Sequence, residues 1–336
     1  MDLTDTVDFE LLNRWQRDFP LEPRPFARIA AQFALDEAAV LARYQALAED
    51  GALSRIGAVF RPNTVGASTL AAMRVPPAAL SGVAAQVSAQ PEVNHNYERE
   101  HALNLWFVAT AADATALEGA LRRIEQASGF AVLRLPLVEE YHIDLGFDLH
   151  SGAVPRLPFE APRTPRRLSA GERALVDALG EGIPLVAAPY AALGAAAGLD
   201  EAGVIALLHD WLALGVMRRF GVVLRHRPLG YAANAMVVWD VPDGEVRAAG
   251  LRAAALPQVT LCYRRPRRRP AWPFNLYCML HGRARDEVEA AIEHVAREAG
   301  LSGHPRQVLF SRQCFMQRGA RYARAAAEVA QEAAHG

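Results

Sequence analysis

The stretch TLAAMRVPPAALSGVAAQVSAQPEVNHNYEREHALNLWFVAT, residues 69–110, changes its pattern along its length. Residues 69–75 are typical of a strand, residues 77–89 of a helix that follows a proline pair, and residues 92–99 and 103–110 of two further strands. A second helix is expected over residues 112–127 and a last strand over residues 132–145. This order, βαββαβ, predicts a ferredoxin-like α/β module.

Three short helices and an extended segment precede this module. Apolar spacing predicts a first helix that begins near Phe9, and a proline-broken turn leads into a second helix over residues 26–33. Asp36 is suited to cap the N-terminus of a third helix, and Gly51 follows its end. Residues 53–60 are extended and punctuated by glycine, so the unit is predicted to be a winged helix-turn-helix.

The whole unit occurs twice, at an offset of 164 residues (35 to 199). Leu35-Asp36-Glu37-Ala38 corresponds to Leu199-Asp200-Glu201-Ala202, and Tyr97 corresponds to Tyr263 after a two-residue slip. We therefore predict an α+β fold, a tandem duplication of winged helix-turn-helix plus ferredoxin-like modules, whose halves form a pseudo-dimer. This order of modules resembles the Lrp/AsnC family of transcription regulators. The expected boundaries are 1–66 and 67–150 for the two modules of copy one, 151–167 for a linker, 168–230 and 231–320 for copy two, and 321–336 for a C-terminal helical tail.

Composition excludes several kinds of chemistry. All 36 basic residues are arginine, so a lysine Schiff base and a P-loop lysine are both impossible. A net charge of −1 gives no global attraction to nucleic acid or membrane. The three cysteines lack C-x-x-C spacing, and neither a basic, apolar leader nor a membrane-spanning run is present, so we expect a cytoplasmic protein.

Three stretches carry a resemblance to a known family. They are VNHNYEREHALNLWF at 93–107, YHIDLGF at 141–147, and CYRR at 262–265 running on to WPFNLY at 272–277. The chain resembles the D-type and L-type subunits of siroheme decarboxylase, joined in one polypeptide, over nearly its whole length. The resemblance implies conversion of siroheme to 12,18-didecarboxysiroheme on the route to haem d1. A related two-subunit enzyme serves an alternative haem pathway, and the fused arrangement favours haem d1.

Siroheme carries eight carboxylates, so its site needs local cations. Copy two has a run of five arginines within six residues, 264–269, interleaved with aromatic side chains that suit a macrocycle. The alternatives for this run are a solvated loop or a nucleic-acid contact. The predicted substrate-binding residues are Arg99, Tyr97, Tyr263, Arg264, Arg265, Arg267, Arg268, Trp272 and His281.

Decarboxylation leaves negative charge on a carbon that must then be protonated, and histidine has a suitable pKa. We expect His95 and His101, on either side of a hairpin turn, to lie close together, and His142 to join them from the fourth strand. One of these histidines is an alternative ligand for the substrate's iron. No dedicated metal site and no separate cofactor are expected, since the iron arrives with siroheme. In copy two, Leu261 stands where His95 aligns.

The main alternatives are a ligand-responsive Lrp/AsnC regulator and a non-catalytic tetrapyrrole carrier. The expected recognition helices are acidic: Asp36 to Asp50 contains four carboxylates and one arginine, and Asp200 to Leu214 contains three and none. Both helices should repel phosphate, so DNA binding is not expected. Four arginines in the wing of copy two keep the regulator open: Arg218, Arg219, Arg225 and Arg227. Homodimerisation and assembly with other decarboxylase subunits are also left open.

Overall fold

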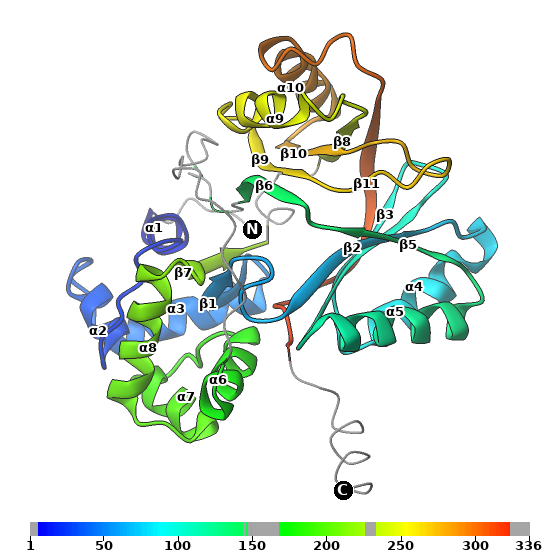
Figure 1. Ribbon diagram of the computed structural model, residues 1–336. Helices are drawn as coiled ribbons and strands as arrows, with labels where there is room; N and C mark the ends of the chain where they lie inside the picture. Colours follow the sequence, from blue (N-terminus) through cyan, green and yellow to red (C-terminus); the bar gives the residue numbers. More distant parts are fainter. Residues whose placement is uncertain (1–5, 144–145, 147–148, 150–167, 226–232, 323–336) are drawn as a thin grey trace, which may run out of the picture.

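The computed structural model describes residues 6–143, 146, 149, 168–225 and 233–322. The predicted linker, 151–167, lies outside these residues, as does the predicted C-terminal helix from residue 323 onward. The described chain forms a helix-turn-helix pair beside a large β-structure covered by helices (Figure 1).

Each copy begins with the three predicted helices. They are α1 (Thr6–Arg14), α2 (Pro25–Ala30) and α3 (Glu37–Glu49) in copy one, and α6 (Ala170–Gly180), α7 (Pro189–Ala197) and α8 (Glu201–Ala213) in copy two. The predicted cap is confirmed, because the Asp36 carboxylate accepts a hydrogen bond from the Ala39 N–H at 2.6 Å. Asp200 caps α8 in the same way, through the Gly203 N–H at 2.8 Å.

The extended segments after these helices pair across the two copies. Strand β1 (Leu53–Phe60) runs antiparallel to β7 (Met217–Leu224), with Gly57 opposite Gly221. We expected a wing within each copy, whereas each copy contributes one strand to a shared ribbon. Gly221 is required there, since a Cβ at this position would lie 2.4 Å from the Trp15 carbonyl oxygen. The ribbon therefore joins the two helix-turn-helix units into one body with a common hydrophobic core.

The α/β modules follow the predicted order. Copy one contains β2 (Ala67–Met73), a 3-10 turn (Pro77–Ala79) and α4 (Leu80–Ala89), β3 (Val93–Arg99), β4 (Leu105–Ala111), α5 (Ala114–Ser128) and β5 (Val132–Pro136). Copy two contains β8 (Ala233–Trp239), α9 (Val246–Ala254), β9 (Val259–Arg264), β10 (Leu276–Gly282), α10 (Arg285–Glu298) and β11 (Arg306–Gln317). Each set packs its helices on one face of its sheet.

The last strand of copy one differs from the prediction. The expected strand over 132–145 is two strands, β5 and β6 (Glu139–Ile143), which pair with β2 of copy one and β9 of copy two. Pro136 lacks an N–H and ends β5. In the same way, β11 pairs first with β8 and then with β3 of copy one.

These exchanges join the strands of both copies into one sheet. Its strand order is β5-β2-β4-β3-β11-β8-β10-β9-β6, and its two end strands, β5 and β6, are consecutive in the chain and separated by only residues 137–138. The chain thus links one end of the sheet to the other, and this arrangement, to which both copies contribute, is called the ring below. Its interior is a buried cluster that includes Trp106 of copy one and Tyr263, Trp272 and Tyr277 of copy two. The halves are held together by this ring as well as by the ribbon.

No single helix in the described residues is long and apolar enough to span a membrane. Taken together, the bent pair Pro189–Ala197 and Glu201–Ala213 has the length and composition of a membrane span.

Candidate active site

Strand β3 carries three of the predicted site residues on one face. His95, Tyr97 and Arg99 alternate along it, and their partners on β4 are Val108 for His95 and Trp106 for Tyr97. Trp106 belongs to the cluster inside the ring, so this face points inward. The imidazole of His95 stacks beside the Tyr97 ring, with 6.3 Å between centroids.

His95 is held in its neutral form. Its Nδ1 lies 2.8 Å from Asn94 Oδ1, and the residue is half-buried. Burial, together with the nearby Arg55 guanidinium, lowers the pKa of His95 to about 4. At neutral pH the ring is therefore uncharged, with a proton on one nitrogen and a lone pair on the other.

His101 lies in the turn after β3 and has the opposite arrangement. Its Nδ1 accepts the Leu103 N–H at 2.9 Å, so the ring proton of the neutral form is on Nε2. Burial lowers the pKa of His101. Its ring meets the edge of Trp272, from copy two, at 5.4 Å between centroids. A pocket of about 440 Å³ opens here, lined by Pro77, Leu80, Glu98, Arg99, Glu100, His101, Asn104 and Arg312.

The predicted convergence of three histidines is wrong. His95 is paired in mid-strand, whereas β4 begins only at Leu105 and His101 lies beyond the end of β3. His95 and Arg99 are four residues apart along β3, about 13 Å, and His101 lies beyond Arg99 at that end of the strand. The error for His142 lies in the strand order, because the fourth strand of this module neighbours the first. His142 lies on β6, buried opposite Cys262 of copy two.

Two buried arginines occupy equivalent places in the two copies. Arg99 and Arg265 are 7% and 9% exposed, and each guanidinium lies over a tyrosine, Tyr97 and Tyr263 respectively. Each donates to a carbonyl of the other copy: Arg99 to Leu309 at 3.1 Å, and Arg265 to Leu135. Neither forms an ion pair with a described carboxylate, and the buried Nε of each makes no hydrogen bond there. Both cations are therefore suited to an incoming anion.

The rest of the arginine run is less available than we expected. Arg264 bonds Asp243 at 2.7 Å, and Arg267 bonds Asp240 and Asp243 at 2.6 and 2.8 Å. Asp240 also accepts from Arg269 at 3.0 Å. These two carboxylates pair with three of the five arginines and offset two of the five positive charges that the sequence suggested for a substrate.

Arg268 and Trp272 brace the loop that carries this run. The two residues form a β-bridge, and Arg268 Nε donates to the Arg134 carbonyl of copy one at 3.0 Å. Trp272 is buried and donates to the Tyr277 hydroxyl at 2.6 Å. The loop thus covers one end of the ring interior and meets His101 there.

His281 lies apart from the pocket that His101 lines. It is on β10, and its Nδ1 is 2.5 Å from Asn234 Oδ1 on the neighbouring strand β8. The residue of β10 that lies opposite Arg264 is Leu276, at the other end of the strand. The position of His281 near the arginine run, which the sequence had suggested, is therefore not supported.

Two residues near the predicted site were not identified from the sequence. Arg55 reaches His95 from the ribbon, and its buried Nε makes no hydrogen bond to a described residue. Arg312, on β11, lies at the mouth of the pocket, 3.6 Å from Glu98 and 3.7 Å from Glu100. Both arginines reach copy one's motif only through the packing of distant segments, so no local signal marks them.

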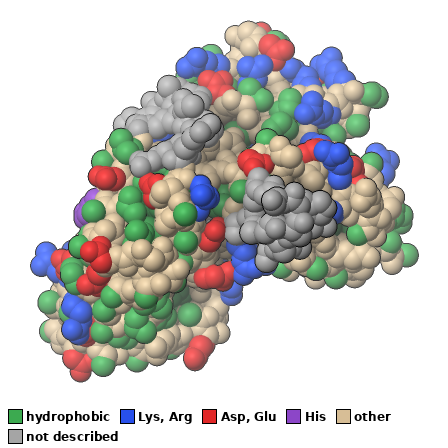
Figure 2. Space-filling model, turned by 60° about the horizontal axis from the view of Figure 1, so that its bottom comes forward, with side chains coloured by type: hydrophobic (Ala, Val, Ile, Leu, Met, Phe, Trp, Pro, Cys, Tyr) green, Lys and Arg blue, Asp and Glu red, His purple; other side chains and the backbone are tan. Residues whose placement is uncertain are grey.

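Two of the four arginines of the copy-two wing, Arg218 and Arg219, are held within the protein and are not presented to DNA as the regulator alternative requires. Arg219 is 4% exposed and donates to the Gln16 and Val222 carbonyls, and Arg218 forms an ion pair with Glu140. Arg225 is exposed, and Arg227 lies outside the described residues. Figure 2 shows acidic side chains interspersed with basic ones on the face in view.

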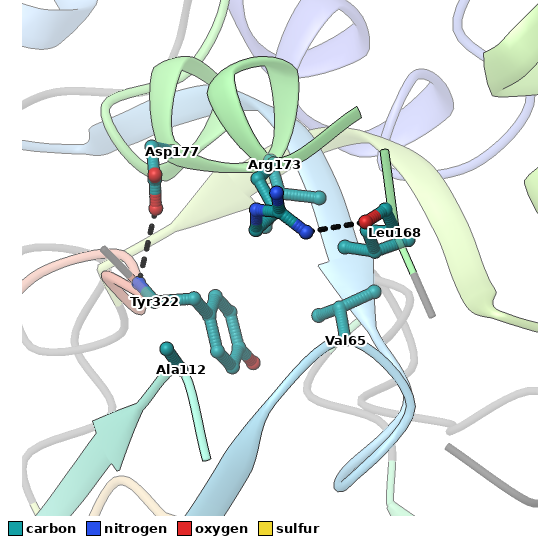
Figure 3. A pocket seen from close by; sticks show the side chains of 7 residues that line it. Val65, Ala112, Leu168, Arg173, Asp177 and Tyr322 are labelled. Atoms are coloured by element: carbon teal, nitrogen blue, oxygen red, sulfur yellow. Dashed lines mark hydrogen bonds between the residues drawn. The ribbon is translucent and has the colours of Figure 1, made fainter. Parts of the chain in front are cut away.

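A smaller pocket, of about 190 Å³, lies between α6 and copy one's module (Figure 3). The Tyr322 ring fills one side of it, and the Tyr322 N–H donates to Asp177 at 3.2 Å. Burial raises the pKa of Tyr322 to about 12. No predicted site residue lines this pocket. Tyr322 thus anchors the chain after β11 to the helix-turn-helix body.

Matches to models of protein families define the class of fold. The AsnC-like ligand binding domain matches residues 65–142 and 228–316, and the siroheme decarboxylase NirDL-like HTH domain matches residues 8–53 and 172–218. The protein is therefore a tandem protein of Lrp/AsnC architecture.

Individual relatives then give the family. The siroheme decarboxylase NirDL subunit of Paracoccus pantotrophus is 48% identical over 96% of this chain and 99% of its own. The NirL subunit of Stutzerimonas stutzeri is 47% identical over 44% of this chain and 87% of its own. A crystal structure of the siroheme decarboxylase NirDL with an iron-uroporphyrin III analogue matches with a TM-score of 0.66 and 26% identity, over 94% of this chain and 93% of that one. The chain belongs to the siroheme decarboxylase family, and it is an enzyme of the carboxy-lyase class.

Proposed function

We propose that this chain converts siroheme to 12,18-didecarboxysiroheme on the route to haem d1. The observation that carries the proposal is the match to a fused siroheme decarboxylase over almost the full length of both chains. The buried arginines Arg99 and Arg265 support it, because neither has a carboxylate partner among the described residues. A substrate with many carboxylates supplies the negative charge that would pair with them.

Arginine forks hold the carboxylates in this proposal. Arg99 and Arg312 face the pocket beside His101, and Arg55 lies beside His95. Arg265 and Arg268 remain proposed contacts for a substrate that reaches the ring interior, together with Tyr97, Tyr263 and Trp272 as surfaces for the macrocycle. Arg264 and Arg267 contribute less, because aspartates already neutralise them.

His101 is the proposed proton donor. As an acetate side chain loses carbon dioxide, the electrons of its carbon–carbon bond pass into the adjoining pyrrole system, and the carbon then takes up a proton. In this step His101 acts as an imidazolium: its Nε2–H protonates the carbon, the ring becomes neutral, and solvent restores the proton, while the Arg99 cation in the same pocket orients a carboxylate. No organic cofactor is part of the proposal, and the iron arrives with the substrate.

Anaerobic incubation with siroheme, followed by mass spectrometry of the pigment, tests this proposal. We expect loss of two carboxyl groups, and the Paracoccus pantotrophus relative serves as the active control. His101→Gln should lower turnover by about 10²–10⁴-fold while leaving pigment binding within about twofold. Pigment that is bound but unchanged by the wild-type chain would favour a tetrapyrrole carrier instead.

A further inference from the structure

A chain of hydrogen bonds fixes which nitrogen of His95 bears the proton. The Thr110 hydroxyl lies 3.0 Å from the Arg321 carbonyl oxygen, and that oxygen can only accept, so Thr110 donates to it. Thr110 Oγ1 therefore accepts from the Asn94 amide at 3.3 Å. This leaves Asn94 Oδ1 facing His95 Nδ1 at 2.8 Å, and only an Nδ1–H satisfies that contact.

The opposite orientation of Asn94 fails. With its amide nitrogen toward His95, its oxygen would face Thr110, whose single hydroxyl proton is already given to Arg321. Asn94 is 3% exposed, so water is poorly placed to repair the mismatch. His95 is therefore the Nδ1–H tautomer, and its Nε2 lone pair makes no hydrogen bond to any residue in the described ranges.

We propose that His95 Nε2 is the axial ligand of the substrate's iron. The inference rests on the proposed function and assigns this histidine a place within it. Histidine binds iron as a neutral imidazole whose other nitrogen donates to a second group, and Asn94 is that group here. The neighbouring Arg55 guanidinium suits one of the macrocycle's carboxylates and makes a protonated His95 unfavourable.

The two copies and the two histidines differ in a way that this assignment explains. His101 carries its proton on Nε2 and can donate it, whereas His95 presents a lone pair, so the two residues of one motif have complementary roles. In copy two, Leu261 and Thr260 occupy the positions of His95 and Asn94. Each chain accordingly holds one iron, bound by copy one.

Spectroscopy of the full chain with ferric iron-uroporphyrin III and with metal-free uroporphyrin III provides the test. We expect the wild-type chain to give the Soret shift and electron paramagnetic resonance spectrum of a histidine-ligated iron, at one iron per chain. His95→Leu, which installs copy two's residue, should lose that signature and bind the metal-free pigment within about twofold of wild type. His209→Leu, at an exposed position on α8, is the matched control and should retain the signature.

Two further variants cover the case in which His95→Leu fails to fold. Asn94→Thr should weaken binding of the iron pigment by about tenfold, because the ligand loses its orienting partner. His95→Gly should regain the ligated spectrum when free imidazole is added. An unchanged iron spectrum in His95→Leu or in His95→Gly without imidazole would overturn the inference while leaving decarboxylation standing. A wild-type chain that binds neither pigment and leaves siroheme intact would remove the proposed function itself.

Discussion

The contrast between His95 and His101 shows what single residues contribute. Both were expected to donate protons, since both lie in the motif at 93–107. The sequence cannot specify a tautomer, which depends on Asn94 and Thr110 for His95 and on the Leu103 N–H for His101. The motif thus located the residues, and their hydrogen-bond partners separate their proposed roles.

The depressed pKa of His95 predicts a distinct pH dependence of stability. Because the pKa is about 4 in the folded chain and about 6.5 unfolded, the folded state binds fewer protons between these values. The free energy of unfolding is therefore highest, as far as His95 is concerned, above pH 6.5. It falls by on the order of 3 kcal/mol as the pH is lowered to 4. Urea unfolding across this range should show a shallower loss in His95→Leu than in wild type. Parallel pH profiles of the two proteins would contradict the account.

Arg99 tests whether a buried cation serves binding or stability. Burying a guanidinium that has no carboxylate partner costs free energy. Arg99→Met should therefore leave the free energy of unfolding unchanged or raise it by about 1 kcal/mol. The same variant should weaken binding of iron-uroporphyrin III at least about tenfold. Thermal unfolding and pigment titration measure the two effects. A clearly destabilised variant with normal binding would make Arg99 a structural clamp on the Leu309 carbonyl.

At the scale of elements, local pattern predicted most of the helices and strands, and long-range pairing was beyond it. The Asp36 cap, the order βαββαβ and both sets of three helices could be identified because each depends on nearby residues. The exchange of β6 to β9 and the pairing of β1 with β7 depend on the other copy. The loop at 264–269 was misjudged for the same reason, since its neutralising aspartates, Asp240 and Asp243, lie more than twenty residues away.

The ribbon offers a sharp test of that pairing. Gly221→Ala places a Cβ 2.4 Å from the Trp15 oxygen and 2.6 Å from the Gln16 oxygen, so we expect a loss of about 2–3 kcal/mol in the free energy of unfolding. Gly244→Ala is the matched control, because its Cβ meets nothing within 4 Å. Urea unfolding of both variants gives the comparison, and equal stability would show that the ribbon does not pack this tightly.

At the scale of the whole molecule, the ring makes the two copies one structure. Each copy supplies the strand that completes the other's edge, β6 onto β9 and β11 onto β3. The proposed site depends on this union, since Arg312 of copy two meets the motif of copy one.

Cutting the chain within 151–167 should therefore leave a functional complex. Co-expressed halves 1–160 and 161–336 are expected to co-purify as a 1:1 complex in light scattering, with iron-uroporphyrin III binding near that of the intact chain. Each half expressed alone should aggregate or self-associate, because it exposes an unpaired strand edge. Two soluble monomeric halves that bind pigment separately would refute the shared ring.

In the proposed reaction this chain removes carboxyl groups from siroheme, and a proton takes the place of each. The decisive experiment is anaerobic turnover of siroheme in deuterated water, followed by mass spectrometry of the pigment. We predict a pigment that has lost two molecules of carbon dioxide and carries one deuterium at each vacated carbon. A siroheme pool of unchanged mass, bound to folded protein while the control enzyme turns over, would contradict it.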